Sequence, residues 1–503
     1  MVNGQTLNNR QHRAGASRPA EFGYGFALAQ RPVWSLEQVL AATGGNLWGD
    51  RNEAVFRLVA TDSRTLEVGD LFVALRGDNF DGHDFVTEVL RRGAAGLVLE
   101  KPPAEPVPVP VILVADTLRA LGDLAHYRRR LMGELKVLAI TGSSGKTTVK
   151  EMTAAILERR LGRNRVLKTR GNLNNLIGLP MSLLAVDDHH NFAVMEMGMN
   201  RFGEIARMAE IAEPDIACIT NVQEAHLAGL TDVAGVARAK GELFQGMGPG
   251  TTLVVNRDDP RVWRLAREIP RHRVTFGRKA GAMVRATYIR SRGEEGMSFT
   301  LALGDDWRGR VKIAALGTHN VNNALAAAAL ALAAGLTPGE IVAGLEDYRP
   351  FAKRLRIQPL VCGLKLIDDS YNANPSSMLA ALETVHNLRR HRKVVAILGD
   401  MLELGSHGPA AHRFIGEKVA KLNFDYLLTV GDFADETALA AGRAGMTGER
   451  VRACADKEEI VGWLQEAVAQ GRLGTDDLVL LKASRGMKME TIIDGLSQGR
   501  EQG

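Results

Sequence analysis

A chain of 503 residues with 45% hydrophobic and 24% charged residues has the composition of an ordinary soluble protein, with room for about two to four domains. The formal net charge of +5 is small, and acidic residues are interleaved with basic ones along the sequence, which argues against a nucleic-acid-binding protein and suits anionic small substrates. Cys218, Cys362 and Cys454 lie far apart without metal-ligand spacing, which argues against a disulfide framework and favours a reducing, cytoplasmic compartment.

The first 32 residues are rich in Asn, Gln, Arg, Gly and Ala and have no sustained periodicity, so we expect a disordered tail over residues 1–32. They lack the apolar core of a signal peptide, and no apolar stretch of the chain is long enough to span a membrane. Organised sequence begins near Trp34, where Ser35 can cap a helix. A first domain over 33–135 is predicted, with strands at 71–75, 96–99 and 111–114 and a closing helix at 118–131.

The segment Lys136–Thr148 carries the strongest chemical signal. A buried strand is predicted up to Thr141, followed by Gly142, Ser143, Ser144 and Gly145 as a turn and by a helix from Lys146 onward. A strand, a glycine turn and a helix N-terminus together form a cradle for phosphate. Lys146 would reach the outer phosphates of a nucleoside triphosphate, and the Thr147 hydroxyl would ligate Mg²⁺. The motif is the short Gly-x-x-Gly-Lys-Thr form, because Ile140 stands where the longer pattern has glycine.

Two further domains are predicted from alternating apolar runs and helical stretches. Strands at 192–195, 216–219 and 252–255 indicate a central, mostly parallel sheet within residues 136–348, with a less regular β-rich segment at 272–317 and an alanine-rich helix at 322–334. Strands at 364–367, 394–398, 426–430 and 478–481 indicate a Rossmann-like, doubly wound sheet within residues 349–503. The predicted fold class is therefore α/β with three domains.

Polar residues follow several of these strands, where open α/β sheets bind ligands. Glu196 could face the phosphate loop and hold Mg²⁺. His226 follows the next strand, although a lone histidine is more often a surface residue. Lys240 lies in a helical stretch and by itself indicates only a solvated lysine. The run of two acids and two asparagines at 368–375 indicates a binding loop, with a simple turn as the alternative.

In order along the chain, these segments resemble the Mur ligase family of ATP-dependent amide-bond-forming enzymes. The resemblance covers nearly everything from about residue 33 to 495. It is carried by Thr61–Arg64, Leu71–Leu75, Phe80–Phe85, Thr141–Thr147, Gly171–Asn175, Glu196–Gly198, Ala239–Glu242, Gly317–Asn320, Asp368–Pro375 and Gly399–Gly405. The last two segments point to the member of the family that joins D-alanyl-D-alanine to UDP-MurNAc-tripeptide in peptidoglycan synthesis.

The resemblance implies an N-terminal domain for the UDP-sugar, a central ATPase and a C-terminal domain that closes over the nucleotide. It implies ATP and Mg²⁺ as cofactors, UDP-MurNAc-tripeptide and D-alanyl-D-alanine as substrates, and a cytoplasmic monomer. The implied reaction transfers the ATP γ-phosphate to the tripeptide carboxylate, and the dipeptide amine then displaces phosphate from the acyl phosphate. Such chemistry needs mainly positioning and charge neutralisation.

The resemblance also implies roles for individual residues. Lys146, His226 and Lys240 would be catalytic, and Thr147, Glu196, His226 and Lys240 would surround Mg²⁺. Ser63 and Arg64 would contact the uridine nucleotide, and Asn172 the sugar or peptide. The nucleotide would be bound by the segment from Gly142 to Thr148, by Asn320 and Asn323 near adenine, and by Arg354, Asp369 and Tyr371 near the ribose and phosphates.

Lys240 matches a family position that can be carbamylated by CO₂, which would turn a cation into a metal ligand; the alternative is an unmodified lysine that contacts phosphate. Two departures concern the C-terminal contacts: Lys353 stands where the family commonly has glycine, and so does Ala483. Two other functions remain to be distinguished. One is a sibling ligase, such as a folylpolyglutamate synthase or the enzyme that adds the third residue of the tripeptide, and the other is a P-loop regulatory ATPase.

Overall fold

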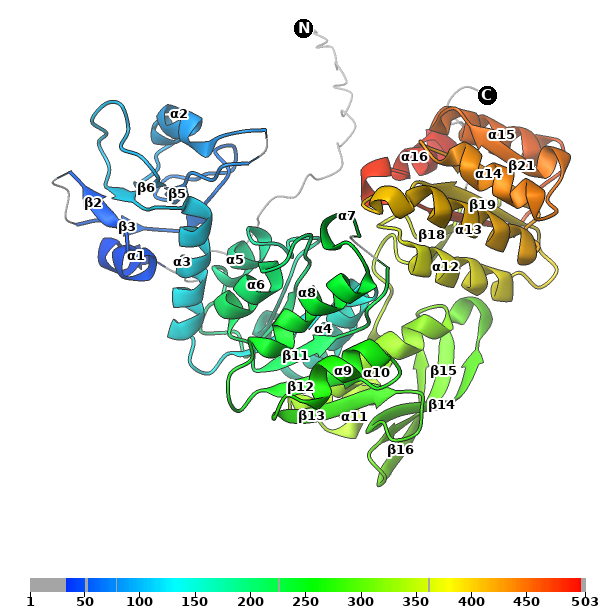
Figure 1. Cartoon of the computed structure of the whole chain (residues 1–503), viewed down its shortest axis with the longest axis horizontal. Helices are drawn as coiled ribbons and strands as arrows, with labels where there is room; N and C mark the ends of the chain where they lie inside the picture. Colours follow the sequence, from blue (N-terminus) through cyan, green and yellow to red (C-terminus); the bar gives the residue numbers. More distant parts are fainter. Residues whose placement is uncertain (1–32, 50–52, 78, 225–226, 361, 499–503) are drawn as a thin grey trace, which may run out of the picture.

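The computed structural model describes residues 33–49, 53–77, 79–224, 227–360 and 362–498. Three α/β units follow one another along the described chain, each built around its own sheet of five, nine or six strands. Figure 1 shows the five-stranded unit at one end, the nine-stranded unit in the middle and the six-stranded unit at the other end. The α/β class with three domains, expected from the sequence, is confirmed. The expected tail over residues 1–32 lies outside the described residues.

The N-terminal sheet has the strand order β2-β7-β6-β5-β4, parallel except for β2. Ser35 caps the first helix as predicted, because its side chain accepts from the backbone of Gln38 while Gln38 bonds back to the Ser35 amide. The elements of this unit are β1 (Trp34–Ser35), α1 (Leu36–Thr43), β2 (Asn46–Trp48), β3 (Val55–Phe56), β4 (Val59–Ala60), β5 (Leu71–Val73), η1 (Gly82–Phe85), α2 (Val86–Arg91), β6 (Gly96–Leu99), β7 (Val111–Leu113) and α3 (Thr117–Leu131).

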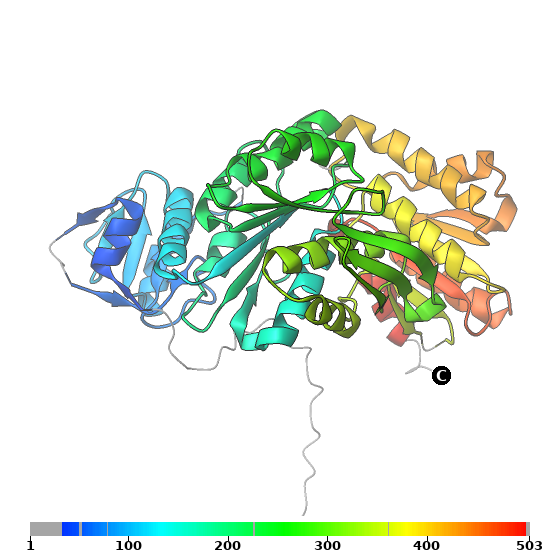
Figure 2. The same ribbon diagram turned by 90° about the horizontal axis from the view of Figure 1, so that it is seen from below.

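Helix α3 joins the N-terminal and central units through a shared hydrophobic core. Its face with Leu121 and Leu124 is fully buried and packs on α1 on one side and on α5 and α6 on the other. At Gly122 a Cβ atom would lie 2.7 Å from Ile211 on α6, so the two helices touch closely there. Figure 2 shows α3 between the two sheets. The predicted closing helix of the first domain is thus also part of the central core.

The central sheet has the strand order β16-β15-β14-β13-β12-β11-β8-β10-β9. The strands from β9 to β14 pair in parallel, as expected, while β15 and β16 add an antiparallel edge, so the sheet is mixed. The β-rich character expected of 272–317 is confirmed, but the segment is more regular than expected, because four strands of this sheet run through it. The strands are β8 (Lys136–Thr141), β9 (Val166–Lys168), β10 (Phe192–Glu196), β11 (Ile216–Ile219), β12 (Thr252–Asn256), β13 (His272–Gly277), β14 (Val284–Ser291), β15 (Met297–Leu303) and β16 (Trp307–Ile313).

Helices cover both faces of the central sheet. Two buried clusters lie on its opposite faces: one contains α5, α6 and α8 together with α3, and the other contains α4, α10 and α11. The helices are α4 (Lys146–Leu161), η2 (Arg163–Arg165), α5 (Gly178–Leu183), α6 (Glu204–Ala212), α7 (Leu227–Leu230), α8 (Val233–Gln245), α9 (Pro260–Arg267), η3 (Gly293–Glu295), α10 (Thr318–Ala333) and α11 (Pro338–Asp347). Helix α10 begins four residues before the predicted start at residue 322, which brings Asn320 into the helix.

The C-terminal sheet has the strand order β17-β18-β22-β19-β20-β21, parallel except for the edge strand β17. Its two faces carry separate apolar clusters, as a doubly wound sheet requires. The elements are β17 (Arg356–Pro359), β18 (Lys365–Asp368), α12 (Pro375–Leu388), β19 (Val394–Gly399), η4 (Gly405–His407), α13 (Gly408–Lys421), β20 (Tyr426–Val430), α14 (Ala434–Arg443), η5 (Gly448–Arg450), β21 (Val451–Cys454), α15 (Lys457–Ala469), β22 (Leu478–Lys482), η6 (Arg485–Met487) and α16 (Glu490–Gln498). Within the described ranges, no helix is long and apolar enough to span a bilayer.

Candidate active site

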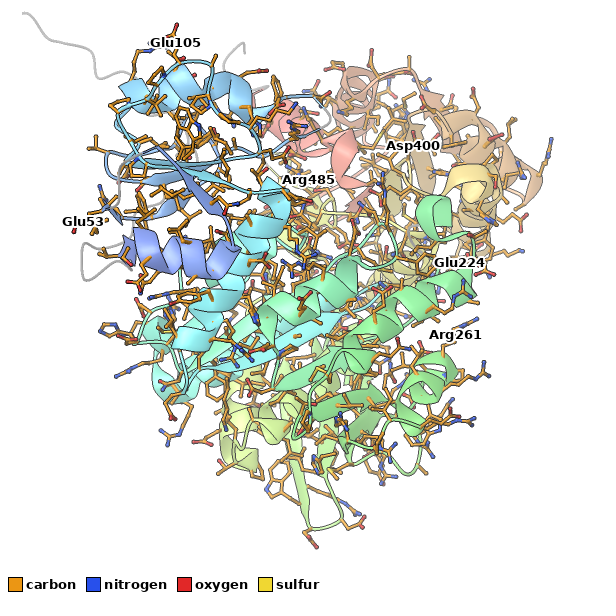
Figure 3. All side chains as sticks on the ribbon, turned by 60° about the vertical axis from the view of Figure 1, so that its left-hand side comes forward. Glu53, Glu105, Glu224, Arg261, Asp400 and Arg485 are labelled. Atoms are coloured by element: carbon orange, nitrogen blue, oxygen red, sulfur yellow. The ribbon has the colours of Figure 1, made fainter. Side chains whose placement is uncertain are left out.

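A cleft of about 1050 Å³ opens at the carboxyl ends of β8, β10, β11 and β12, the place where α/β sheets bind ligands. All three units line it: Arg76 and Leu118 come from the N-terminal unit, and Arg354 and Arg485 from the C-terminal unit. Figure 3 labels Arg485 and also Arg261, which lines the central side of the cleft. The cleft is large enough for a nucleotide together with a second, extended substrate.

The loop between β8 and α4 has the geometry of a phosphate cradle. Gly142 and Gly145 have φ values of 154° and 80°, which few other residues adopt. Added Cβ atoms would lie 1.9 Å from Thr220 Oγ1 and 2.3 Å from Asn323 Oδ1, so both positions exclude any side chain. Ile140 is fully buried within β8, which explains why the longer glycine pattern is absent: the chain turns only after this strand has ended.

Hydrogen bonds tie the loop to the end of β11. The backbone N–H of Ser144 donates to Asn221 Oδ1 at 3.0 Å, and the Thr220 hydroxyl donates to the Ser144 carbonyl at 2.7 Å. Lys146 Nζ folds back onto the Gly142 carbonyl at 2.7 Å. Burial lowers the pKa of Lys146, and the nearby Glu196 opposes this effect. The cradle is therefore held in shape before any ligand binds.

Glu196 is the last residue of β10 and is 2% exposed. Its Oε1 accepts from Asn174 Nδ2 at 2.9 Å, and its backbone N–H donates to the Thr169 hydroxyl at 2.9 Å. Its Oε2 is buried and has no hydrogen-bond partner. A buried carboxylate oxygen without a donor is costly unless a cation balances it, so this atom is a candidate metal ligand.

Lys150 lies one turn beyond the phosphate loop on α4 and is 1% exposed. Its Nζ donates to the Thr169 carbonyl at 2.7 Å, pairs with Glu151 at 3.1 Å and lies 3.9 Å from Glu196 Oε2. Lys168 pairs with the same Glu151 at 2.9 Å. Burial tends to raise the pKa of Glu151, but the two lysines outweigh burial and hold this pKa below its usual range. Behind Glu196, therefore, the basic Lys150, the acidic Glu151 and the basic Lys168 follow one another.

Lys240 on α8 is 1% exposed, which contradicts the picture of a solvated lysine. Its only hydrogen-bond neighbour in the described residues is the sulfur of Met199, 3.8 Å from Nζ. Burial, together with the charge of Lys146, holds the pKa of Lys240 well below its usual range. A buried lysine without an acidic partner stays neutral more readily than a solvated one, and a neutral amine is nucleophilic.

The C-terminal unit reaches the phosphate loop through Arg354. Its Nη2 donates to the Thr147 hydroxyl at 2.9 Å, and its guanidinium lies 4.1 Å from the centre of the Tyr371 ring. Asp369 is held by a buried ion pair with Lys482 at 2.5 Å. Residues separated by more than 200 positions therefore meet at the loop.

Lys353 and Leu355, on either side of Arg354, have φ values of 63° and 51°. Glycine adopts this left-handed conformation without strain, which accounts for its use at the position of Lys353 in the family. Here Lys353 is compensated by an ion pair with Glu490 at 3.1 Å. The departure from the family pattern therefore preserves the backbone geometry that presents Arg354.

The predicted site residues fall into three groups. Thirteen line the cleft, namely Ser143, Ser144, Gly145, Lys146, Thr147, Thr148, Asn172, Glu196, Asn320, Asn323, Arg354, Asp369 and Tyr371. Gly142, Lys240, Ser63 and Arg64 do not; Arg64 is exposed and paired with Asp62 at 2.7 Å. His226 lies outside the described residues. Among the residues that are described, no three His, Cys, Asp or Glu side chains converge as a metal site.

Comparison with known proteins gives this cleft its family. Residues 55–129 match the catalytic domain of the Mur ligase family, residues 140–331 the Mur ligase middle domain, and residues 353–485 the glutamate ligase domain of Mur ligases. The chain belongs to the Mur ligase family. The UDP-N-acetylmuramoyl-tripeptide–D-alanyl-D-alanine ligases of Haemophilus influenzae and Escherichia coli are 35% and 36% identical to it. Each match covers 92% of this chain and 97% or 98% of the relative.

Solved structures of Mur ligases superimpose on the whole architecture. MurF from Acinetobacter baumannii is 35% identical, with a TM-score of 0.84 over 93% of this chain and 99% of that one. The MurF ligase of Thermotoga maritima, whose structure is a complex with ADP, is 27% identical, with a TM-score of 0.77 over 88% of this chain and 97% of that one. Folylpolyglutamate synthase of Mycobacterium tuberculosis, at 18% identity and a TM-score of 0.59 over 76% of this chain and 94% of that one, shares the fold.

Three residues of this Mur ligase site escaped the sequence reasoning. Asn174 orients Glu196, Lys150 lies behind the same carboxylate, and Lys482 holds Asp369. Asn174 is part of the Gly171–Asn175 motif, so its sequence carried a usable signal. Lys482 directly precedes Ala483 in the run that was compared with the family, so it too carried a signal. Lys150 carried none, because a lysine on a helix reveals its buried partner only after folding.

Proposed function

We propose that this chain is the ATP-dependent ligase that joins D-alanyl-D-alanine to UDP-MurNAc-tripeptide, acting in the cytoplasm in peptidoglycan precursor synthesis. One observation carries the proposal: UDP-N-acetylmuramoyl-tripeptide–D-alanyl-D-alanine ligases match 92–93% of the chain. The phosphate cradle, which opens into a cleft shared by all three units, supports it, since both the nucleotide and a long UDP-linked substrate need room there.

The reaction begins with transfer of the ATP γ-phosphoryl group to the tripeptide carboxylate. The carboxylate oxygen forms a bond to phosphorus while the bond to ADP breaks. Lys146 and the backbone N–H groups from Gly145 to Thr148 hold the phosphates and neutralise their charge, which is the main contribution that a protein makes to phosphoryl transfer. Lys146 must leave the Gly142 carbonyl to reach the phosphates, and its long side chain permits this.

Amide formation follows in the same cleft. The dipeptide amine attacks the acyl carbon, a tetrahedral intermediate forms, and phosphate leaves as the amine loses its proton. Arg354, Tyr371 and Asp369 would hold the ribose and phosphates from the C-terminal side, and Asn320 and Asn323 would bind near adenine. Ser63 and Arg64 would contact the uridine nucleotide, and Asn172 the sugar or peptide.

The residues near the cradle fit Mg²⁺. Glu196 Oε2 is a buried anionic oxygen without a donor, and the Thr147 hydroxyl faces the cleft. Glu196, Thr147 and His226 would hold the ion, which when bound would offset the negative charge of the transferring phosphoryl group. Arg354 now uses the Thr147 hydroxyl, so it must move when that oxygen binds metal.

Lys240 would serve this site as a carbamate. Its neutral amine would attack CO₂, form an N–C bond and release a proton, giving an anion that can bind a second Mg²⁺. Burial, with no acidic partner among the residues that the structure describes, favours the neutral amine that this step needs. If so, Lys240→Ala should be nearly inactive and partly rescued by formate or acetate, while small amines should rescue it if the lysine is unmodified. If Lys240→Ala still bound metal but no carboxylate restored its turnover, the carbamate would be excluded.

The domain limits 33–135, 136–348 and 349–503 belong to the same proposal, as does a monomeric state. The three separate sheets support these limits. The shared core around α3 means, however, that the first two domains are expected to remain fixed to each other.

One experiment separates the ligase from its two alternatives. ADP release is measured with ATP, UDP-MurNAc-tripeptide and D-alanyl-D-alanine, and then with each substrate omitted in turn. The ligase requires both substrates, whereas a regulatory ATPase releases ADP at the same rate without them. A sibling ligase responds instead when glutamate with a folate, or UDP-MurNAc-dipeptide with diaminopimelate or lysine, replaces the pair. ADP release that is indifferent to both omissions would refute the proposal, and Lys146→Ala supplies the background rate.

A further inference from the structure

The outer face of the antiparallel edge of the central sheet gathers five cations. Strand β15 is the middle of three strands, and its register with β14 and β16 fixes which side chains share a face. The inner face carries Met297, Phe299 and Leu301, which are buried against the core. Side chains alternate between faces, so Ser298, Thr300 and Ala302 point outward.

The residues opposite these three are almost all basic. Ala302 faces Arg285 on β14 and Arg308 on β16, Thr300 faces Thr287 and Arg310, and Ser298 faces Arg290 and Lys312. We call the five cations Arg285, Arg290, Arg308, Arg310 and Lys312, with the small residues between them, the basic sheet face. The two cationic rows lie about 10 Å apart; neighbouring cations are about 7 Å apart on β16 and about 14 Å apart on β14, from strand spacing and rise.

No acidic side chain forms an ion pair with a cation of this face among the residues that the structure describes. In the described part of the chain, none of the five side chains has an ion pair or a hydrogen bond to another residue. Acids lie in both connecting turns and on α11. Glu294 pairs with Lys365 and Arg392 of the C-terminal unit, and Glu295 pairs with Arg292. Asp305 and Asp306 lie in the turn before β16, and Glu346 accepts from the backbone N–H of Lys312. Ser298 and Ala302 are only 3% and 4% exposed, as expected if cationic side-chain stems cover them.

Exposed apolar groups stand beside the cations. Tyr288 lies in a β-bulge between Thr287 and Arg290, has a φ of 50° and is 80% exposed. Met283, just before β14, is 40% exposed. A bulky residue held in a left-handed conformation and turned toward water has no role in the core, and such strain is common at functional sites.

We propose that the basic sheet face docks the enzyme on an anionic lipid surface. Clustered Arg and Lys residues are attracted to anionic headgroups, and a tyrosine with an exposed ring inserts at the level of these headgroups. A single-stranded nucleic acid fits less well, because Tyr288 is a single largely exposed ring beside the cations, whereas a bound strand stacks successive bases on several rings. The face does not line the catalytic cleft, so docking leaves the cleft free.

The test is co-sedimentation of the full-length enzyme with vesicles of equimolar phosphatidylcholine and phosphatidylglycerol. Pure phosphatidylcholine vesicles should bind far less. The triple variant Arg308→Gln, Arg310→Gln, Lys312→Gln should lower the partition coefficient roughly 100-fold, from about fivefold for each cation removed. A matched control, Arg413→Gln, Lys418→Gln, Lys421→Gln, removes the same charge from α13 and should bind as the wild type does.

Ligase activity in lipid-free solution checks that the triple variant is folded. If it is not, the pair Arg285→Gln, Arg290→Gln tests the same face from the interior strand β14. If the control and the face variants lost vesicle binding equally, net charge alone would explain the binding, and the proposal would be overturned. The proposal would also be overturned if the wild-type enzyme did not bind anionic vesicles, whether or not it binds a thymidine oligonucleotide through these residues.

Discussion

Replacing Lys150 with methionine is expected to destabilise the central domain without removing any residue that contacts a substrate. Lys150 Nζ is buried among the Thr169 carbonyl, Glu151 and Glu196. Methionine has a similar length and fills the same space, so the packing changes little. The substitution therefore isolates the contribution of the buried charge.

The size of the effect follows from the groups left behind. Removing one partner of a buried ion pair destabilises by about 3–5 kcal/mol, because the other charge is left uncompensated. Glu151 keeps Lys168 at 2.9 Å, so we expect the lower end, about 3 kcal/mol. For a domain of about 200 residues this lowers the melting temperature by about 6–12 °C.

Differential scanning calorimetry without ligands measures the change. Lys168→Met is the matched control: the Lys168 side chain is 32% exposed, so its loss should destabilise by at most about 1 kcal/mol. The double variant Lys150→Met, Glu151→Gln should recover part of the loss, because both charges of one pair are removed together. The assignment of Lys150 as the buried counter-charge would be refuted if Lys150→Met had the melting temperature of the wild type. It would also be refuted if the stability loss of the double variant equalled the sum of the losses of the two single variants.

Three further changes test other parts of the site. Lys146→Ala should lower kcat by on the order of 10³-fold with little change in melting temperature; steady-state ADP release measures this, and a variant with half the wild-type turnover would contradict the cradle assignment. Burial lowers the pKa of His319 to about 4, so the folded state binds a proton less readily than the unfolded chain, and stability falls as pH drops below the usual histidine value. His319→Asn should remove this loss, which is about 2 kcal/mol at about pH 5, as measured by urea unfolding; wild-type and variant stabilities with the same pH dependence would contradict it. Burial acts to raise the pKa of Glu490, but hydrogen bonds from its own backbone N–H and from Arg485 and Lys353 hold this pKa at about 2. The contacts therefore stabilise the folded state above the usual pKa of glutamate, and this stabilisation is lost as the pH falls toward 2. Lys353→Gly should relieve strain of about 1 kcal/mol at neutral pH and make stability less sensitive to acid; acid unfolding curves that overlay those of the wild type would show that the ion pair contributes nothing.

The sequence predicted those parts of the fold whose signal is local. The strand that becomes β8, the turn with Gly142 and Gly145, and the start of α4 follow from an apolar run, two glycines and a helical pattern. Most of the parallel strands were found for the same reason, but β4, β9, β13 and β21 were missed. Strands β14 to β16 were not assigned to the central sheet, because the sequence pattern does not show which strands pair.

The site was predictable where a motif carries it and unpredictable where distant residues build it. The cradle residues from Ser143 to Thr148, Glu196 and Arg354 were named from the sequence and line one cleft. The burial of Lys150 depends on partners 19 and 46 positions away, which no local pattern encodes. Likewise, the basic residues look scattered along the chain, and only strand pairing brings five of them together.

The core that α3 shares with α5 and α6 has a consequence for synthesis on the ribosome. When Leu131 has been made, the buried face of α3 is complete on the side of α1, but its other partners lie in residues 178–183 and 204–212. Until those residues leave the exit tunnel, Leu121 and its neighbours have no second surface to pack on. The N-terminal sheet can form early, yet the nascent chain keeps an apolar stripe that chaperones can bind. The C-terminal unit, with two cores of its own, can complete its folding without waiting for any of the preceding helices.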